Sequence, residues 1–124
     1  MRLVVGVSGA SGAPYAERLL RFLALAGIET HVVFTRYGRV CWNHEVGTDP
    51  RLLGHAIHSP DDMTAEFASG SARFDGMAVI PCSAGQLGRI AHGLSADLVG
   101  RAADVMLKQR RPLVLVLRDR KSVV

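Results

Sequence analysis

A glycine-rich segment near the N-terminus has the residue types and spacing of a phosphate-binding turn. Residues 8–13 read Ser-Gly-Ala-Ser-Gly-Ala and stand between a β-branched apolar run and a segment with apolar residues at helical spacing. At such a junction, N–H groups and the helix dipole attract an anion, and Gly9 and Gly12 allow close backbone approach. The segment matches neither the GxGxxG fingerprint nor a P-loop. Two interpretations stay open: a site for a mononucleotide phosphate, or a plain tight turn.

Two further polar residues directly follow apolar runs. Ser83 belongs to the Pro81-Cys82-Ser83 segment that comes after the run at 77–80, and Arg118 comes after the run at 113–117. A residue at the carboxyl end of a buried parallel strand lies where ligands bind in α/β sheets. The Ser83 hydroxyl could meet a ligand there or cap the next helix. The Arg118 guanidinium is suited to a phosphate or a carboxylate.

Three charged residues share one stripe of a predicted helix. Arg101, Asp104 and Lys108 are spaced i, i+3 and i+7, which brings them to the same helix face. By spacing alone, the pattern favours a solvated ladder of ion pairs, each worth less than about 1 kcal/mol.

The histidines and cysteines indicate neither a metal site nor a disulfide framework. The five histidines show no HExxH or other ligand spacing, so we expect no metal. No GxSxG elbow is present for a Ser-His-Asp hydrolase. Cys41 and Cys82 lack CxxC spacing and are predicted to be buried free thiols.

The elements needed to position these residues are those of an α/β protein. Apolar runs at 3–7, 30–34, 77–80 and 113–117 predict strands, and helical spacing or capping predicts helices at 13–26, 35–45, 84–92 and 95–111. No element is assigned within 46–75. Continuously apolar strands that alternate with helices indicate a parallel sheet covered on both faces. The predicted fold is an open, doubly wound, mostly parallel sheet in three layers, Rossmann-like or flavodoxin-like.

Length and composition limit the classes of protein. The chain has 124 residues, of which 48% are apolar and 21% charged, as expected for one domain over 1–124. No apolar run approaches the roughly 20 residues of a membrane helix, and the N-terminus shows no cleavable signal, so we expect a cytoplasmic protein without membrane contact. The net charge of +4 lies in the C-terminal half, but aromatic residues are few. We therefore expect small phosphate ligands rather than nucleic acid.

Several blocks taken together resemble one family closely. The blocks are residues 5–13, residues 29–33, the pair His44-Glu45, residues 68–71, residues 80–83 and the long run 101–115. They are similar to the UbiX family of flavin prenyltransferases, which includes proteins that accompany phenolic acid decarboxylases. The resemblance extends to about Asp119.

The resemblance implies a transferase that moves a dimethylallyl group from dimethylallyl phosphate to reduced FMN. The prenylated FMN would then serve a UbiD-type decarboxylase, and the protein would form a homo-oligomer. By residue match, the implied FMN-binding residues are Gly9, Ala10, Ser11, Thr35, Ser83 and Arg101. The implied catalytic residues are Ser11, Glu45, Lys108, Arg118 and Asp119. The match replaces the ion-pair interpretation of Arg101 and Lys108 by a role at the ligands.

The chain also departs from the family pattern. Thr35 replaces a usual Ser, Gly85-Gln86 replaces a polar pair, and Asp119 replaces a usual Glu. After Asp119 the family sequence is lost, so the chain is expected to lack a C-terminal strand, a helix, and the Tyr and Arg that complete the prenyl phosphate pocket. Two alternatives therefore stay open: an FMN-binding or delivery protein without catalysis, and a flavin-dependent cysteine decarboxylase, which the 101–111 block disfavours.

Overall fold

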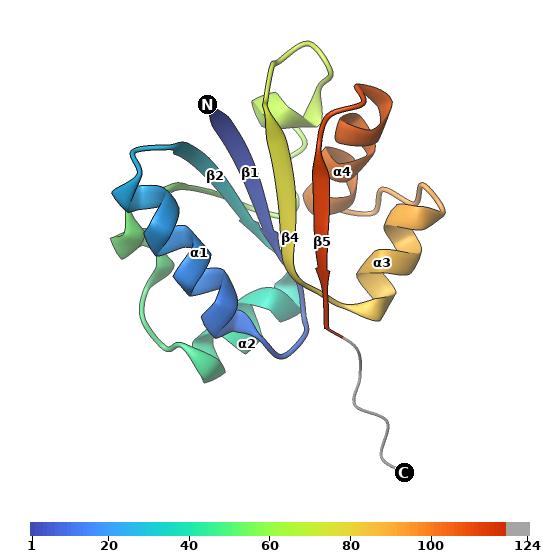
Figure 1. The fold of residues 1–124 in the computed structure, drawn as a ribbon. Helices are drawn as coiled ribbons and strands as arrows, with labels where there is room; N and C mark the ends of the chain where they lie inside the picture. The colour runs from blue at the N-terminus through green and yellow to red at the C-terminus, as the bar shows by residue number, and fades with distance from the viewer. Residues whose placement is uncertain (119–124) are drawn as a thin grey trace.

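The protein is built on one five-stranded parallel sheet with the strand order β3-β2-β1-β4-β5 (Figure 1). The computed structural model describes residues 1–118. The strands are β1 (Arg2–Val7), β2 (Glu29–Phe34), β3 (Ala56–His58), β4 (Gly76–Cys82) and β5 (Leu113–Leu117). The chain moves outward from β1 to β3, then returns to the other side of β1. This order is Rossmann-like, and it confirms the predicted α/β fold and places the switch point between β1 and β4.

Four helices cover the two faces of the sheet. α1 (Ala13–Leu25) and α2 (Arg36–Glu45) pack on one face, and α3 (Ala84–Ala91) and α4 (Leu98–Lys108) pack on the other. Two short 3-10 helices, η1 (Pro50–Leu53) and η2 (Glu66–Ala68), interrupt the connections on either side of β3. The result is the three-layer arrangement visible in Figure 1.

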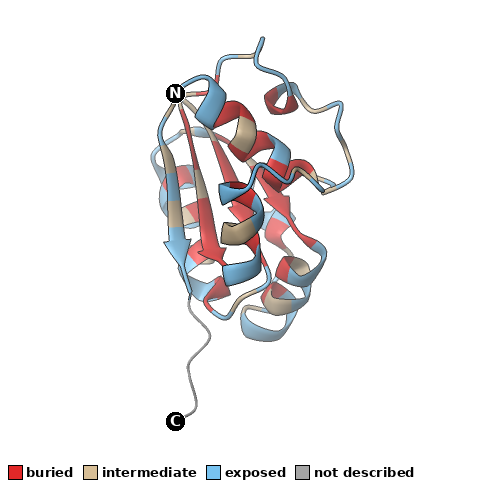
Figure 2. Ribbon diagram, turned by 90° about the vertical axis from the view of Figure 1, so that its right-hand side faces the viewer, coloured by how far each residue is buried: buried red, intermediate tan, exposed pale blue. Residues whose placement is uncertain are grey.

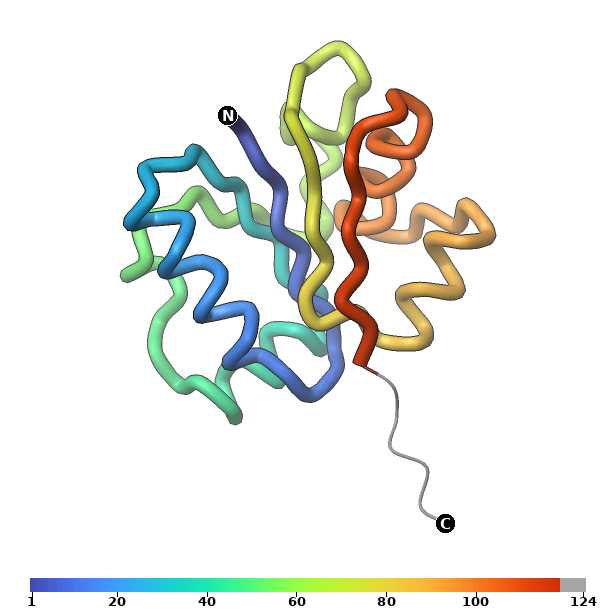
Figure 3. Tube along the Cα trace, viewed as in Figure 1, coloured from blue at the N-terminus to red at the C-terminus, as the bar shows by residue number. Residues whose placement is uncertain are grey.

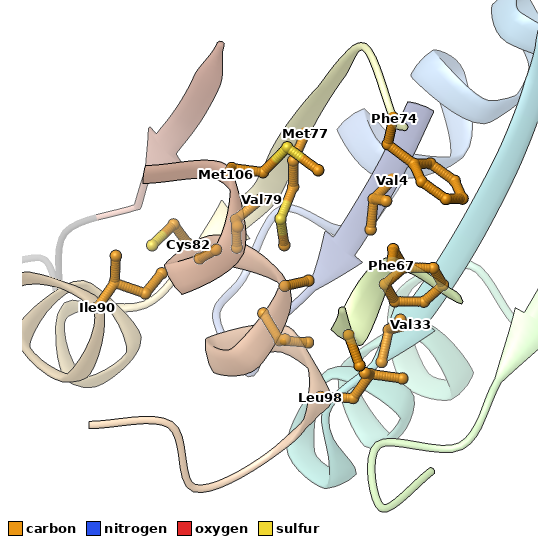
Figure 4. Packing of buried hydrophobic residues seen from close by; sticks show 14 residues of the cluster. Val4, Val33, Phe67, Phe74, Met77, Val79, Cys82, Ile90, Leu98 and Met106 are labelled. Carbon is orange, nitrogen blue, oxygen red and sulfur yellow. The ribbon is translucent and has the colours of Figure 1, made fainter. Parts of the chain in front are cut away.

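Alternating residues of the central strands supply two separate cores. Val4 of β1 and Val79 of β4 pack with Leu98 and Met106 of α4 and with Phe67 of η2 (Figure 4). On the opposite face, the core is formed by Val5, Val7, Leu20, Phe34, Trp42 and their neighbours. Successive side chains of a strand point to opposite faces, so the continuous apolar runs serve both cores. Buried residues accordingly follow the central strands in Figure 2.

Residues 46–75, for which the sequence predicted no helix or strand, contain regular secondary structure. Residues 46–75 contain η1, β3 and η2, and β3 pairs with β2 over only three residues. The predicted start of α4 at Ser95 is wrong. Asp97 is the N-cap, because its side chain accepts a hydrogen bond from the Gly100 N–H at 2.9 Å. Leu98 N–H is held separately by the Pro60 carbonyl.

The edge strand β5 is less buried than predicted. Leu113 and Leu115 pack against the α4 core, but Val114 is 56% exposed and Val116 42% exposed. Val114 lines a hollow with Leu19 of α1, and Val116 lines one with Tyr15 of α1, so both valines face the α1 side of the sheet. In Figure 1, α1 lies on the side of β1 and β2 and does not reach β5. An apolar cavity of about 240 Å³ between α1 and β5 results, with Leu19, Ala78 and Val114 among its lining residues.

Within residues 1–118, no helix is long and apolar enough to cross a membrane.

Candidate functional site at the carboxyl edge of the sheet

Ser8 joins the two strand ends at the switch point. Its hydroxyl donates to the Pro81 carbonyl at 2.8 Å and accepts from the Ser83 N–H at 2.9 Å, and its own N–H donates to Pro81. The residue is 1% exposed. The turn after β1 and the turn after β4 therefore lie side by side at the lower end of the sheet in Figure 3. The Ser8 hydroxyl, one of the two in residues 8–13 that could act as ligand donors, is therefore used to join the two strand ends.

Glu45, at the end of α2, caps the start of α1. One carboxylate oxygen accepts hydrogen bonds from the Gly12 N–H and the Ala13 N–H, both at 3.0 Å. The bond from Gly12 is the main cause that lowers the pKa of Glu45, and Ala13, Ser11 and Arg118 act in the same direction. Two N–H groups of the turn are therefore already bound by this carboxylate and are not free for a phosphate. Glu45 stays ionised beside Ser11.

The remaining part of the turn is open to a ligand. Within residues 1–118, neither the Gly9 N–H nor the Ser11 N–H has a hydrogen-bond partner, whereas the Ala10 N–H donates to the Ser8 carbonyl. A Cβ on Gly9 would overlap the Tyr37 side chain. Gly9 is thus needed for close packing against α2, a reason that differs from the predicted close approach of a ligand.

Thr35 and Ser83 stand at the ends of β2 and β4 as helix N-caps. The Thr35 hydroxyl accepts from the Gly38 N–H at 2.9 Å, and the Ser83 hydroxyl accepts from the Gln86 N–H at 3.1 Å. The capping interpretation of Ser83 is confirmed. A capping hydroxyl retains its own proton as a donor, and neither hydroxyl donates to another residue of the described chain. Both can therefore serve as caps and as ligand donors.

Arg118 forms one wall of a cleft at this edge. Its backbone N–H donates to the Cys82 carbonyl at 2.9 Å, which continues the β4–β5 pairing past the last residue of β5. A cleft of about 480 Å³ is lined by Ser11, Glu45, Arg118, Pro14, Tyr15 and Gly12. An adjoining hollow of about 190 Å³ shares Ser11 and Arg118 and adds the apolar Ile80 and Leu117. Asp119, also predicted as catalytic, lies outside the described residues.

Lys108 and Arg101 do not join this cleft in a single chain. Lys108 ends α4 beside the start of β5, because the following turn brings the Pro112 carbonyl onto the Met77 N–H near the start of β4. Arg118 stands at the opposite end of β5 (Figure 1). Arg101 is nearer the carboxyl edge, where its guanidinium Nε donates to the Ala68 carbonyl at 2.9 Å. Within residues 1–118, Asp104 pairs with neither cation, so the predicted ion-pair ladder does not form.

Two further residues near the site were missed from the sequence. Tyr15 is 64% exposed and lines both hollows around Arg118. Gln86 is 1% exposed, and its amide nitrogen has no hydrogen-bond partner in the described chain. An unsatisfied buried amide is costly, and the replacement of a usual polar pair by Gly85-Gln86 was the signal that could have found it.

The two cysteines and three of the histidines contact other residues of the protein as follows. Cys82 is buried at the end of β4, and burial raises the pKa of its thiol; Cys41 is a free thiol too, but only partly buried. His55 bonds the Leu20 carbonyl, and His58 bonds His31. Among the described residues, no three His, Cys, Asp or Glu side chains are grouped to hold a metal ion.

Comparison with known proteins gives consistent matches. The model of the family called Flavoprotein matches residues 1–121. Flavin prenyltransferase UbiX of Deinococcus radiodurans is 48% identical over 121 residues, which are 95% of this chain and 62% of that protein. The crystal structure of AnUbiX in complex with FMN and dimethylallyl pyrophosphate superposes with a TM-score of 0.92 at 41% identity, over 98% of this chain and 66% of that one.

A second solved structure is as similar. The dodecameric FMN-dependent UbiX-like decarboxylase of Escherichia coli O157:H7 matches all of this chain and 69% of its own, with a TM-score of 0.93 and 42% identity. The present chain thus spans about three fifths to two thirds of the length of these relatives. It belongs to the Flavoprotein family, among the UbiX flavin prenyltransferases and their homologues.

Proposed function

We propose that this protein is a flavin prenyltransferase that transfers a dimethylallyl group from dimethylallyl phosphate to reduced FMN. The observation that carries the proposal is the single cleft in which Ser11, the ionised Glu45 and Arg118 meet. The similarity to AnUbiX, whose structure contains FMN and dimethylallyl pyrophosphate, supports both ligands.

The described residues fit a phosphorylated flavin. The N–H groups of Gly9 and Ser11 and the hydroxyls of Thr35 and Ser83 are donors at three adjacent strand ends. Backbone N–H groups and hydroxyls of this kind are the donors that a phosphate or a ring carbonyl requires. When bound, reduced FMN supplies a nucleophilic ring nitrogen. Gly9, Ala10, Ser11, Thr35 and Ser83 would hold it, and Arg101 would contribute after leaving the Ala68 carbonyl.

Glu45 and Arg118 have different tasks in this proposal. Glu45 holds a negative charge beside the Ser11 hydroxyl and can orient that hydroxyl or accept a proton there. Arg118 lines the same cleft and would stabilise the charge that collects on the departing phosphate. The leaving group is already a phosphate, so a positioned cation is the main requirement.

We further propose that the protein works as a homo-oligomer. Lys108 and Arg118 lie at opposite ends of one sheet, so only the Lys108 of another copy can approach the cleft of the first. The uncovered apolar residues Val114 and Val116 provide surface for such association, and the E. coli relative is dodecameric. A UbiD-type decarboxylase is the proposed recipient of the product, on the basis of family resemblance.

The decisive experiment is anaerobic incubation of the purified chain with reduced FMN and dimethylallyl phosphate, followed by mass spectrometry of the extracted flavin. A mass increase of one dimethylallyl unit supports the proposal. Bound flavin of unchanged mass would instead identify a binding or delivery protein, and absence of flavin binding would refute both interpretations. Arg118→Gln should lower the rate by about 10²–10³, the usual cost of one electrostatic donor. Arg18→Gln, an exposed change on α1, is the matched control.

A further inference from the structure

A second pocket lies beside the proposed flavin site, at the carboxyl ends of β2 and β3. Its volume is about 220 Å³, and its polar wall is formed by Arg36, Arg39, His58 and Ser59. Phe34 lines the apolar side. Thr35, one of the proposed FMN-binding residues, also lines this pocket, so the pocket adjoins the flavin site. The cleft around Arg118 shares none of its lining residues.

Two arginines give this pocket its charge. Arg36 and Arg39 come from the first turn of α2, and within residues 1–118 neither lies within ion-pair distance of a carboxylate. The Arg39 guanidinium is 5.5 Å from the centre of the Phe34 ring, which helps to position it. Asp49, an acid that acts on Arg39 at longer range, is bound by Arg51 at 2.8 Å.

His58 is the third polar group of the wall, and a neighbouring histidine holds its ring. Its Nε2 lies 2.9 Å from His31 Nδ1, and His31 Nε2 lies 2.7 Å from the Glu29 carboxylate. Because His58 lines the pocket, a proton that it takes up adds positive charge to the pocket wall.

Charged groups on several elements affect the pKa of His58. Burial, followed by the charge of His31, lowers its pKa, while Asp62 and Glu66 oppose this shift. Arg2 of β1 engages Glu29 and Glu66 at 3.0 Å, which reduces the pull of both carboxylates. On the pocket side, Arg36 and Arg39 are the charged groups that line the wall with His58. The lowered pKa favours the neutral form of His58 at pH 7.

We propose that this pocket is a second anion site, which takes the phosphate group of a small phosphorylated molecule between Arg36 and Arg39 and binds it more tightly when His58 is protonated. Arg36 and Arg39 are three residues apart on one face of α2, so their guanidinium groups can bind several phosphate oxygens at once. Ser59 adds a hydroxyl donor. The volume exceeds that of a bare phosphate ion, which leaves room for the organic part of the ligand. The inference rests on Arg36 and Arg39 and not on the proposed prenyl transfer, although Thr35 belongs to both sites.

The test uses inorganic phosphate and pyrophosphate as probes, with amide chemical shifts of the ¹⁵N-labelled full chain as the readout. Shifts should concentrate at Arg36, Arg39 and Ser59, and affinity should rise from about pH 7.5 to about pH 5.5, across the range in which histidine titrates. Arg36→Gln combined with Arg39→Gln should weaken binding at least tenfold, as expected from loss of charged hydrogen bonds. Arg18→Gln should leave it unchanged.

Two further measurements distinguish loss of anion binding from a folding defect in the variant, and a separate anion site from part of the flavin site. In the unsubstituted protein, saturating phosphate should raise the pKa of His58 in a ring-proton titration, because proton and anion binding are linked. The titration is repeated with FMN present, and phosphate binding at Arg36 and Arg39 should persist. Loss of phosphate binding in the FMN-loaded protein would overturn the proposal, since the pocket would then be part of the flavin site. An unchanged His58 pKa, or shifts located elsewhere, would overturn it as well.

Discussion

The clearest energetic consequence of the structure concerns the carboxylate that caps α1. Glu45→Gln removes the charge that receives two backbone hydrogen bonds at this helix start, from Gly12 and Ala13. Loss of an N-terminal cap costs about 1 kcal/mol, and loss of a negative charge at a helix start costs about 0.3–1 kcal/mol. The residue is largely exposed, so solvent screening favours the lower end. We expect a loss of about 1 kcal/mol at neutral pH.

The pH dependence separates this cause from a general packing defect. The pKa of Glu45 is lower in the folded than in the unfolded chain, so its contribution is complete above the unfolded pKa and is lost as pH falls through the folded pKa. Denaturant unfolding of the flavin-free protein should therefore show a difference between wild type and Glu45→Gln at about pH 7 that shrinks as the pH falls below the ordinary pKa of a glutamate, about 4.3.

The matched control is Glu17→Gln, which removes a partly buried carboxylate paired with the exposed Arg21 on the same helix. That pair should contribute only about 0.2–0.5 kcal/mol. Equal losses in the two variants, or a Glu45→Gln loss that does not change with pH, would refute the capping argument.

Three other outcomes are expected. Gly9→Ala should destabilise the fold by about 1–3 kcal/mol in denaturant unfolding, because its Cβ would overlap Tyr37; full stability with weakened flavin binding would contradict this. Ser83→Ala should cost about 1 kcal/mol as a lost cap, whereas Ser83→Asp should retain the cap and still weaken flavin binding. Sedimentation should show an oligomer that Val116→Lys weakens, and a stable wild-type monomer at micromolar concentration would contradict the proposed assembly.

Short local patterns in the sequence were sufficient to predict most of the strands and helices. The runs at 3–7, 77–80 and 113–117 are apolar at nearly every position, and only strands buried on both faces place such runs favourably. β3 could not be foreseen, because its three residues carry no period of their own and are strands only by pairing with β2. Ser95 and Asp97 are both good caps by type, and packing of the loop against Pro60 selected Asp97.

For the site, residue type and position along a strand were enough to mark Ser11, Ser83 and Arg118, because the ends of parallel strands must meet at one edge. The sequence alone could not say that Glu45 reaches the start of α1, 33 residues earlier in the chain, since that contact exists only when α2 packs beside β1. It also could not separate Lys108 from Arg118. Ten residues apart in sequence, they stand at opposite ends because a strand runs the full depth of the sheet between them. Local propensity determines which elements form, whereas the distance between side chains on different elements is decided by how those elements pack.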